Sequence, residues 1–217
     1  MFHPIKTVFS TLLALFVLAS MVSAQESEVI KLPAPRTEGG RPLLGCLAQR
    51  SSQREFGPDK ISPQVLSDLL WAADGINRPG QGKRTAPSAV NWQDIDIYVS
   101  TADGLFVYRP EKQELQKILD TDVRAEMGSQ EFVKEVPLNL IYVSDYSRIS
   151  RGTDADKQFY SGTHTGFISQ NVYLFCSSEG LATVVRGLID REAMARVMKL
   201  RPEQHITFAQ SVGYPRK

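Results

Sequence analysis

The chain has 217 residues, enough for one domain with a single hydrophobic core. Its composition is that of a globular protein, with 42% hydrophobic and 23% charged residues. A formal net charge of +1 argues against nucleic acid, a membrane surface or another polyanion as a partner held through bulk electrostatics.

The first 24 residues have the pattern of an export signal. Lys6 precedes an apolar run from Val8 to Val22, and small residues suited to signal-peptidase cleavage end at Ala24. The run is shorter than the roughly 20 residues that span a bilayer, although an uncleaved anchor is the alternative. It has no twin-arginine pair before it, and no Cys follows the cleavage site, which favours the general secretory route. We therefore expect residues 1–24 to be removed and the mature protein to be periplasmic or secreted, without stable membrane insertion.

Residues 25–44 are expected to form an extended arm or linker. Pro33, Pro35 and Pro42 together with Gly39-Gly40 oppose a continuous helix. Such an arm could lie across a partner subunit. Residues 45–217 would then form the folded domain.

A helix is predicted to begin at Ser62-Pro63, which supply an N-cap and a proline at the first helical position. Apolar residues recur on one face from Val65 to Ile76. Glycines and a proline then predict a loop that contains Lys83 and Arg84.

Strands are predicted next. Residues 94–99 alternate, residues 101–104 form a turn, and residues 105–108 return as a second strand. Residues 113–119 suit either a strand or a short helix. Residues 138–143 form a nearly continuous apolar run, which is typical of a buried central strand.

The longest predicted helix covers residues 157–179 and ends at Gly180. Because its middle is apolar on several sides, we expect this helix to form the core of the domain. A strand at residues 182–185, a short helix from Asp190 to Met198 and a last strand at residues 205–212 complete the chain. The mixture has no regular βαβ rhythm, which predicts an α+β fold.

Few residues suggest catalysis by side chains alone. His164 and His205 are interpreted as structural, and His3 lies in the signal. Cys46 and Cys176 have no neighbouring metal ligands, so no metal site is predicted; we favour unpaired buried thiols over a disulfide. An enzyme with this sequence would therefore depend on a bound cofactor.

Two short segments contain candidate binding residues. Arg50, Ser51, Ser52 and Arg54 could donate hydrogen bonds to a phosphate and to sugar hydroxyls, although a solvated basic turn is the alternative. In residues 85–93, small residues would let a flat ligand approach closely, and polar groups could bind it. An ordinary loop remains the alternative there, and Trp92 would more simply be a core or interface residue. The candidates in this second segment are Pro87, Ser88, Ala89 and Asn91.

The order and spacing of motifs across about residues 45–217 resemble those of the nitroreductase family. The resemblance is strongest to the branch that includes azoline dehydrogenases of peptide-modifying systems. The motifs are, in chain order, Arg50-Ser51-Ser52-Gln53-Arg54, Leu69 to Gly75, Pro87-Ser88-Ala89-x-Asn91, Thr165-Gly166-x-x-x-Gln170-Asn171-x-x-Leu174, Glu179-Gly180-Leu181, Gly187 and Gly213-Tyr214-Pro215. Each motif is weak alone, and the set is uninformative about the substrate.

This resemblance implies a mostly antiparallel central sheet flanked by helices, in an intertwined homodimer with FMN at the subunit interface. Arg50 and Ser52 would hold the phosphate and the ribityl chain, with Ser51 and Arg54 also in contact. Residues 87–91 would reach the flavin from the other subunit. The backbone of the segment from Val184 to Gly187 would lie near flavin N5.

Three departures from the family pattern affect these expectations. Arg186 stands where many relatives have an acidic residue, which would change the charge beside the flavin ring. The chain stops at Arg216-Lys217, where many relatives continue to a basic phosphate ligand, so Arg216 is the candidate substitute. Ala182 replaces a frequent glycine.

The implied reaction is ping-pong hydride transfer through flavin N5, usually from NAD(P)H, to a small-molecule acceptor. No side chain is identified as its acid or base. Because nicotinamides are scarce outside the cytoplasm, the alternative is an exported dimeric flavin- or ligand-binding protein with little or no turnover.

Overall fold

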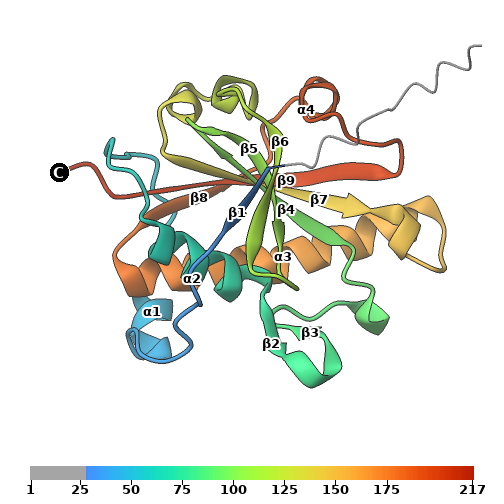
Figure 1. Ribbon diagram of the computed structural model, residues 1–217, viewed down its shortest axis with the longest axis horizontal. Helices are drawn as coiled ribbons and strands as arrows, with labels where there is room; N and C mark the ends of the chain where they lie inside the picture. The colour runs from blue at the N-terminus through green and yellow to red at the C-terminus, as the bar shows by residue number, and fades with distance from the viewer. Residues whose placement is uncertain (1–27) are drawn as a thin grey trace, which may run out of the picture.

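The computed structural model describes residues 28–217, so the expected signal peptide lies outside the described residues. A seven-stranded sheet with the order β1-β6-β5-β4-β7-β9-β8 forms the centre of the molecule (Figure 1). Every neighbouring pair of strands is antiparallel. Helices cover both faces, and this arrangement confirms the α+β class. The strands are β1 (Val29–Lys31), β4 (Ile95–Thr101), β5 (Gly104–Arg109), β6 (Glu114–Leu119), β7 (Leu138–Asp145), β8 (Ala182–Arg186) and β9 (Gln204–Gly213).

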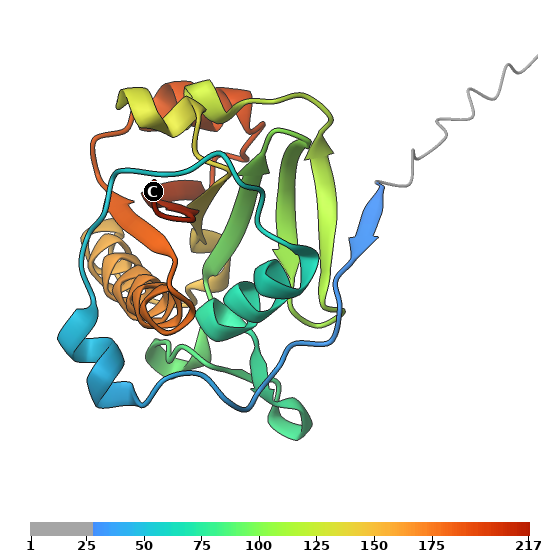
Figure 2. The same cartoon turned by 90° about the vertical axis from the view of Figure 1, so that its left-hand side faces the viewer.

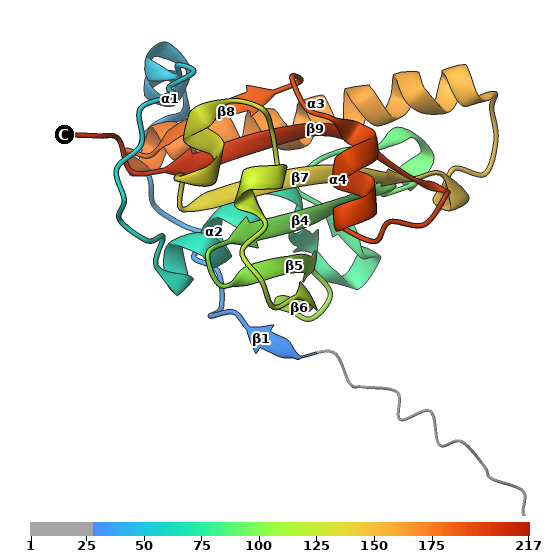
Figure 3. The same cartoon turned by 90° about the horizontal axis from the view of Figure 1, so that it is seen from above.

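One face of the sheet packs against α2 (Pro63–Asp74) and α3 (Asp154–Glu179). Alternate strand residues such as Ile97 and Leu140 meet Leu69 and Val172 there in one buried cluster. The opposite face lies under α4 (Arg191–Val197) and short 3₁₀ turns, where Met194 belongs to a second cluster. Figure 2 shows the sheet between these two layers. Figure 3 shows the strands side by side from β8 to β1.

The predicted helix caps are present. Ser62 Oγ accepts a hydrogen bond from Val65 N, Asp190 caps α4 through Ala193 N, and Gly180 ends α3 in the left-handed region. Helix α3 begins at Asp154, earlier than predicted, because Thr153 forms a capping box with Asp156.

Of the two interpretations left open for residues 113–119, the strand is confirmed, since β6 pairs with both β5 and β1. Three details differ from the sequence-based expectations. The predicted loop after α2 contains a small hairpin of β2 (Ile76–Arg78) and β3 (Lys83–Arg84). Residues 43–49 form helix α1 (Leu43–Gln49), so the extended segment ends at Pro42. Helix α3 is buried on one side only, and Phe159 is 71% exposed.

Cys46 and Cys176 are both buried and unpaired. Within residues 28–217, no helix is long and apolar enough to cross a membrane. The same residues contain no cluster of potential metal ligands.

Candidate functional site

Residues of the first candidate segment contact Tyr173 on α3. Its hydroxyl lies 2.8 Å from Ser52 Oγ, and the Arg50 guanidinium lies over its ring at 5.3 Å from the centroid. Gln53 N donates to Thr183 O at 3.0 Å, which fixes the segment 50–54 beside β8.

The C-terminal segment joins the same place. Phe56 pairs with Pro215 in an isolated bridge, and Gly57 N donates to Tyr214 O at 2.8 Å. Arg216 N donates to Glu55 O at 3.2 Å, so the Arg216 backbone lies beside Glu55, the residue that follows Arg54. Arg50, Arg54 and Arg216 have no carboxylate partner among residues 28–217. The Arg50 guanidinium lies at the Tyr173 ring, whereas Arg54 and Arg216 lie on the two adjoining segments, and Arg216 Nε donates to Phe56 O at 3.4 Å.

The open edge of β8 borders this group. Val185 N donates to the Tyr173 hydroxyl at 3.0 Å, and Thr183 O accepts from Gln53 on the same side. Gly187 directly follows Arg186, the last residue of this strand. A pocket of about 180 Å³ adjoins this place, with Ser51, Tyr173 and Thr183 in its wall, and Arg41 is the arginine that lines it. The Val184 side chain is buried on the opposite face of the sheet.

We call this assembly the Tyr173 group. It comprises Arg50, Ser51, Ser52, Arg54, Tyr173, Gly187 and Arg216. A phosphate and a polyol chain require several cationic and hydroxyl donors, and this group supplies both kinds. The donor set therefore fits a flavin mononucleotide.

The second candidate segment is a strained loop. Val90, Asn91 and Gln93 all have positive φ values, of 50°, 58° and 47°. Non-glycine residues adopt this region at a cost, and such strain is concentrated at functional sites. Ser88 Oγ accepts from Gln93 N at 3.0 Å and closes the loop.

His164 on α3 holds this loop from below. Its Nε2 accepts from Ala89 N at 2.8 Å, so the ring proton lies on Nδ1, which donates to Asp94 Oδ1 at 2.5 Å. Asp94 Oδ2 also accepts from Ser144 Oγ at 2.8 Å and Ser161 Oγ at 3.1 Å. Burial opposes ionisation of Asp94, but these hydrogen bonds hold its pKa below the usual value. We call residues 87–91 with His164 and Asp94 the His164 group.

Within one chain, the Tyr173 group and the His164 group lie apart. Tyr173 and His164 are nine positions apart on α3, which corresponds to about 13 Å along a helix axis. Pro87, Ser88, Ala89 and Asn91 therefore belong to a separate place from Arg50 and Ser52.

Arg186, one of the three departures from the family pattern, is buried against the sheet. Its side chain is 3% exposed and points away from the α3 face, where it donates to Met127 O, Asn139 Oδ1 and Ser211 Oγ. All three partners are neutral, and burial lowers the pKa of Arg186 to about 10. The side chains of Val184 and Arg186 share one face of β8 because side chains alternate along a strand. The Arg186 guanidinium is therefore directed to the face of β8 opposite α3 and Tyr173.

Tyr173 was missed from the sequence, although it lies between Asn171 and Leu174 of the motif in residues 165–174. His164 was interpreted as a satisfied structural residue, and the structure agrees, because it is 3% exposed and both ring nitrogens are hydrogen-bonded. Its contact with the candidate loop, 75 positions away in the sequence, was not predicted.

Comparison with known proteins identifies the family of this chain. The nitroreductase family matches residues 47–214. A protein of Methanocaldococcus jannaschii, provisionally named as a nitroreductase, is 32% identical over 170 residues, which cover 73% of this chain and 85% of the relative. A crystal structure from Ralstonia eutropha JMP134, also provisionally named as a nitroreductase, shares 36% identity with a TM-score of 0.84, over 89% of this chain and 92% of the other. A provisionally named nitroreductase from Desulfovibrio desulfuricans, solved in complex with FMN, shares 20% identity with a TM-score of 0.59, over 82% and 89% of the two chains.

Proposed function

This chain belongs to the nitroreductase family, and we propose that it is an FMN-dependent oxidoreductase of the azoline dehydrogenase-like branch. The observation that carries the proposal is the Tyr173 group, in which unpaired arginines and hydroxyls adjoin an open strand edge. The sequence motifs support the branch. The solved relative that contains FMN supports the cofactor.

Each part of the Tyr173 group has a role in this proposal. Arg50, Arg54 and Arg216 would bind the phosphate, because guanidinium groups form paired charge-assisted hydrogen bonds with phosphate oxygens. Ser51 and Ser52 would bind the ribityl hydroxyls. The Gly187 N–H would donate to the flavin ring at the edge of β8. The bound flavin supplies the hydride chemistry, from a reduced nicotinamide to a small-molecule acceptor.

A homodimer would complete the site. In the dimer that the family resemblance implies, a partner subunit would supply Pro87, Ser88, Ala89 and Asn91 to the flavin held by the Tyr173 group. Large apolar side chains support such an interface, with Phe159 at 71%, Leu44 at 78% and Val90 at 66% exposure. Sedimentation of the FMN-loaded protein should give twice the monomer mass. A flavin-loaded monomer would contradict the shared site.

FMN titration into apoprotein tests the cofactor assignment. Arg50→Ala should weaken binding at least about tenfold, because charged hydrogen bonds contribute roughly 1.5–3 kcal/mol each. Arg50→Lys keeps the charge but loses the paired geometry, so its affinity should be intermediate. Arg151→Ala removes an exposed arginine without a partner among the described residues and is the matched control. Unchanged affinity in Arg50→Ala would mean that the phosphate lies elsewhere.

Export of this protein remains part of the proposal. N-terminal sequencing of protein from intact cells should find Gln25 first, and an intact Met1 in the soluble fraction would refute cleavage. Export also keeps the second candidate function open, that of a flavin-binding protein with little turnover. Anaerobic addition of NADPH separates the two: bleaching of the flavin band supports the oxidoreductase, and a persistent band supports the binding protein.

A further inference from the structure

A second cavity lies beside the strained loop, at the ends of β4 and β5. Its volume is about 440 Å³, within the range of small-molecule sites. Asn91 contributes to its wall, so the cavity adjoins the His164 group. Three arginines also line it, and we call it the arginine pocket. Its charged lining residues are Arg84, Arg109, Arg148, Asp96 and Glu111.

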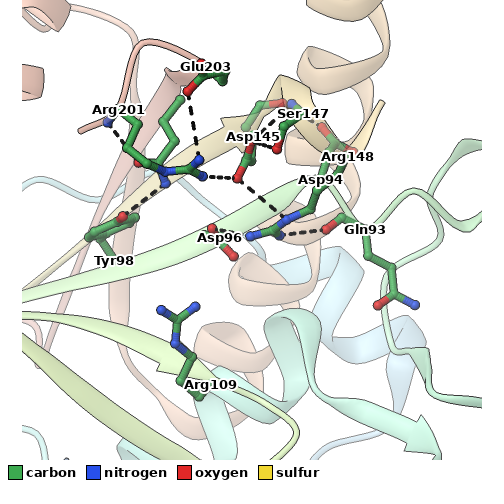
Figure 4. Close-up of polar contacts among 12 residues, drawn as sticks. Gln93, Asp94, Asp96, Tyr98, Arg109, Asp145, Ser147, Arg148, Arg201 and Glu203 are labelled. Carbon is green, nitrogen blue, oxygen red and sulfur yellow. Dashed lines mark hydrogen bonds and ion pairs between the residues drawn. The ribbon is translucent and has the colours of Figure 1, made fainter. Parts of the chain in front are cut away.

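Two of the arginines are held by neighbouring acids. Arg148 Nη2 donates to Asp96 Oδ2 at 2.6 Å, and its Nη1 donates to Gln93 O at 3.0 Å (Figure 4). Arg84 Nη2 meets Glu111 Oε1 at 2.8 Å. These contacts fix the two guanidinium groups in the wall of the pocket.

The charge of the pocket is positive. The wall has three arginines and two carboxylates, Asp96 and Glu111, and the Glu111 side chain is 60% exposed. Asp145, outside the wall, lies 3.8 Å from Arg148, but it also pairs with Arg201. Asp74 lies 3.3 Å from Arg84, but burial raises the pKa of Asp74 to about 8. Asp74 is therefore mostly protonated at neutral pH and does not cancel the charge of Arg84.

Arg109 differs from the other two arginines of the pocket because it has no carboxylate partner among the described residues. Its Nε donates to Gln116 Oε1 at 2.9 Å, and it forms no ion pair with any residue from 28 to 217. In Figure 4 its guanidinium extends from β5 toward Asp96. Within residues 28–217, its two terminal nitrogens have no hydrogen-bond acceptor, and the residue lines the cavity.

We propose that the arginine pocket binds the carboxylate or phosphate of an anionic small molecule, with Arg109 as the direct contact. A guanidinium that is already fixed at Nε presents its terminal nitrogens in the fork geometry that matches both anions. Because Asn91 lies in the same wall, the ligand would be the electron acceptor or donor of the flavin reaction. That last assignment rests on the proposed function, whereas anion binding at Arg109 does not.

Calorimetric titration of the FMN-loaded protein tests this proposal. The probes are succinate, inorganic pyrophosphate and the neutral analogue succinamide, which are not aromatic and so cannot bind by stacking on a flavin. At least one anion should bind, succinamide should bind at least tenfold more weakly than succinate, and Arg109→Gln should weaken anion binding at least tenfold. Arg109→Lys should be intermediate. Arg151→Gln, which changes the net charge equally at an exposed site, should bind as wild type does.

The outcomes distinguish a carboxylate ligand from a phosphate ligand, and they test anion binding separately from the proposed flavin-dependent function. Binding of succinate alone assigns a carboxylate, and binding of pyrophosphate alone assigns a phosphate. Binding of neither anion, or equal binding by the Arg109→Gln and wild-type proteins, overturns the proposal. Flavin absorbance of the same samples reports FMN content independently. If the protein takes up no FMN, the proposed function fails while anion binding to the apoprotein still tests Arg109.

Discussion

The contact between His164 and the strained loop predicts a large effect of His164→Ala. The substitution removes the imidazole that joins Ala89 N to Asp94, whose side chain has no solvent exposure. Asp94 would keep only the hydroxyls of Ser144 and Ser161. A buried carboxylate would thus lose its strongest partner, and a backbone N–H would lose its acceptor.

The expected loss of stability is about 3–5 kcal/mol, the usual cost of breaking a buried polar pair from one side. A domain of this kind is stable by about 5–15 kcal/mol, so the variant should remain folded but marginal. Because hydrogen bonds lower the pKa of Asp94, their contribution is present above the pKa of an unfolded carboxyl. It is lost as pH falls through the folded-state pKa. The difference between wild type and His164→Ala should therefore shrink in acid.

Urea unfolding at pH 7, followed by tryptophan fluorescence, measures this effect. Trp92 lies 6.4 Å from the His164 ring and reports the loop directly. Ser161→Ala is the matched control, since it removes a hydroxyl 3.1 Å from the same carboxylate and 2.7 Å from Ser144 Oγ, and it should cost less, about 1.5–3 kcal/mol. FMN affinity should also fall in His164→Ala, because residues 87–91 would lose their anchor. A variant within about 1 kcal/mol of wild type would show that the network does not hold the loop.

Two further predictions concern burial and backbone geometry. Wild type should lose stability as pH rises from about 4 to 8, because the folded-state pKa of Asp74 is raised to about 8 and each pKa unit is worth about 1.4 kcal/mol. Asp74→Asn should remove this loss. Parallel pH profiles of the wild-type and variant proteins in urea unfolding would refute the prediction. Gly104→Ala should cost about 2 kcal/mol or more, since φ is +134° and a Cβ would lie 2.3 Å from Leu119 O. Gly162→Ala on α3, where a Cβ meets nothing within 4 Å, should instead be neutral or stabilising by up to about 1 kcal/mol in thermal unfolding.

Elements with a local signal were predictable from the sequence. Ser62, Asp190 and Gly180 mark helix ends through their own backbone or side-chain chemistry, so their roles do not depend on the rest of the fold. Helix α1 was missed because no side-chain cap opens it and three prolines precede it. The state of residues 113–119 was left open because strand pairing with β5 and β1 decided it, and that pairing is not local.

The candidate site was predictable only in its separate segments. Arg50 and Ser52 attract attention as a run of donors, but Tyr173, 121 positions from Ser52, decides how that run is held. The direction of Arg186 depends on which face of β8 is covered by α3, and no motif contains that information. Sequence therefore identified the chemistry of the donors better than the contacts that orient them.

Strand β1 also constrains where the chain can safely be cut. It pairs with β6 through Val29, Ile30 and Lys31, and Lys117 N donates to Glu28 O at 2.8 Å just before them. Deleting these residues would leave the outer backbone groups of β6 open, and an uncovered strand edge can pair with another molecule. A truncation beyond residue 31 should consequently promote aggregation of folded protein, whereas a chain that starts before Glu28 retains its own edge protection.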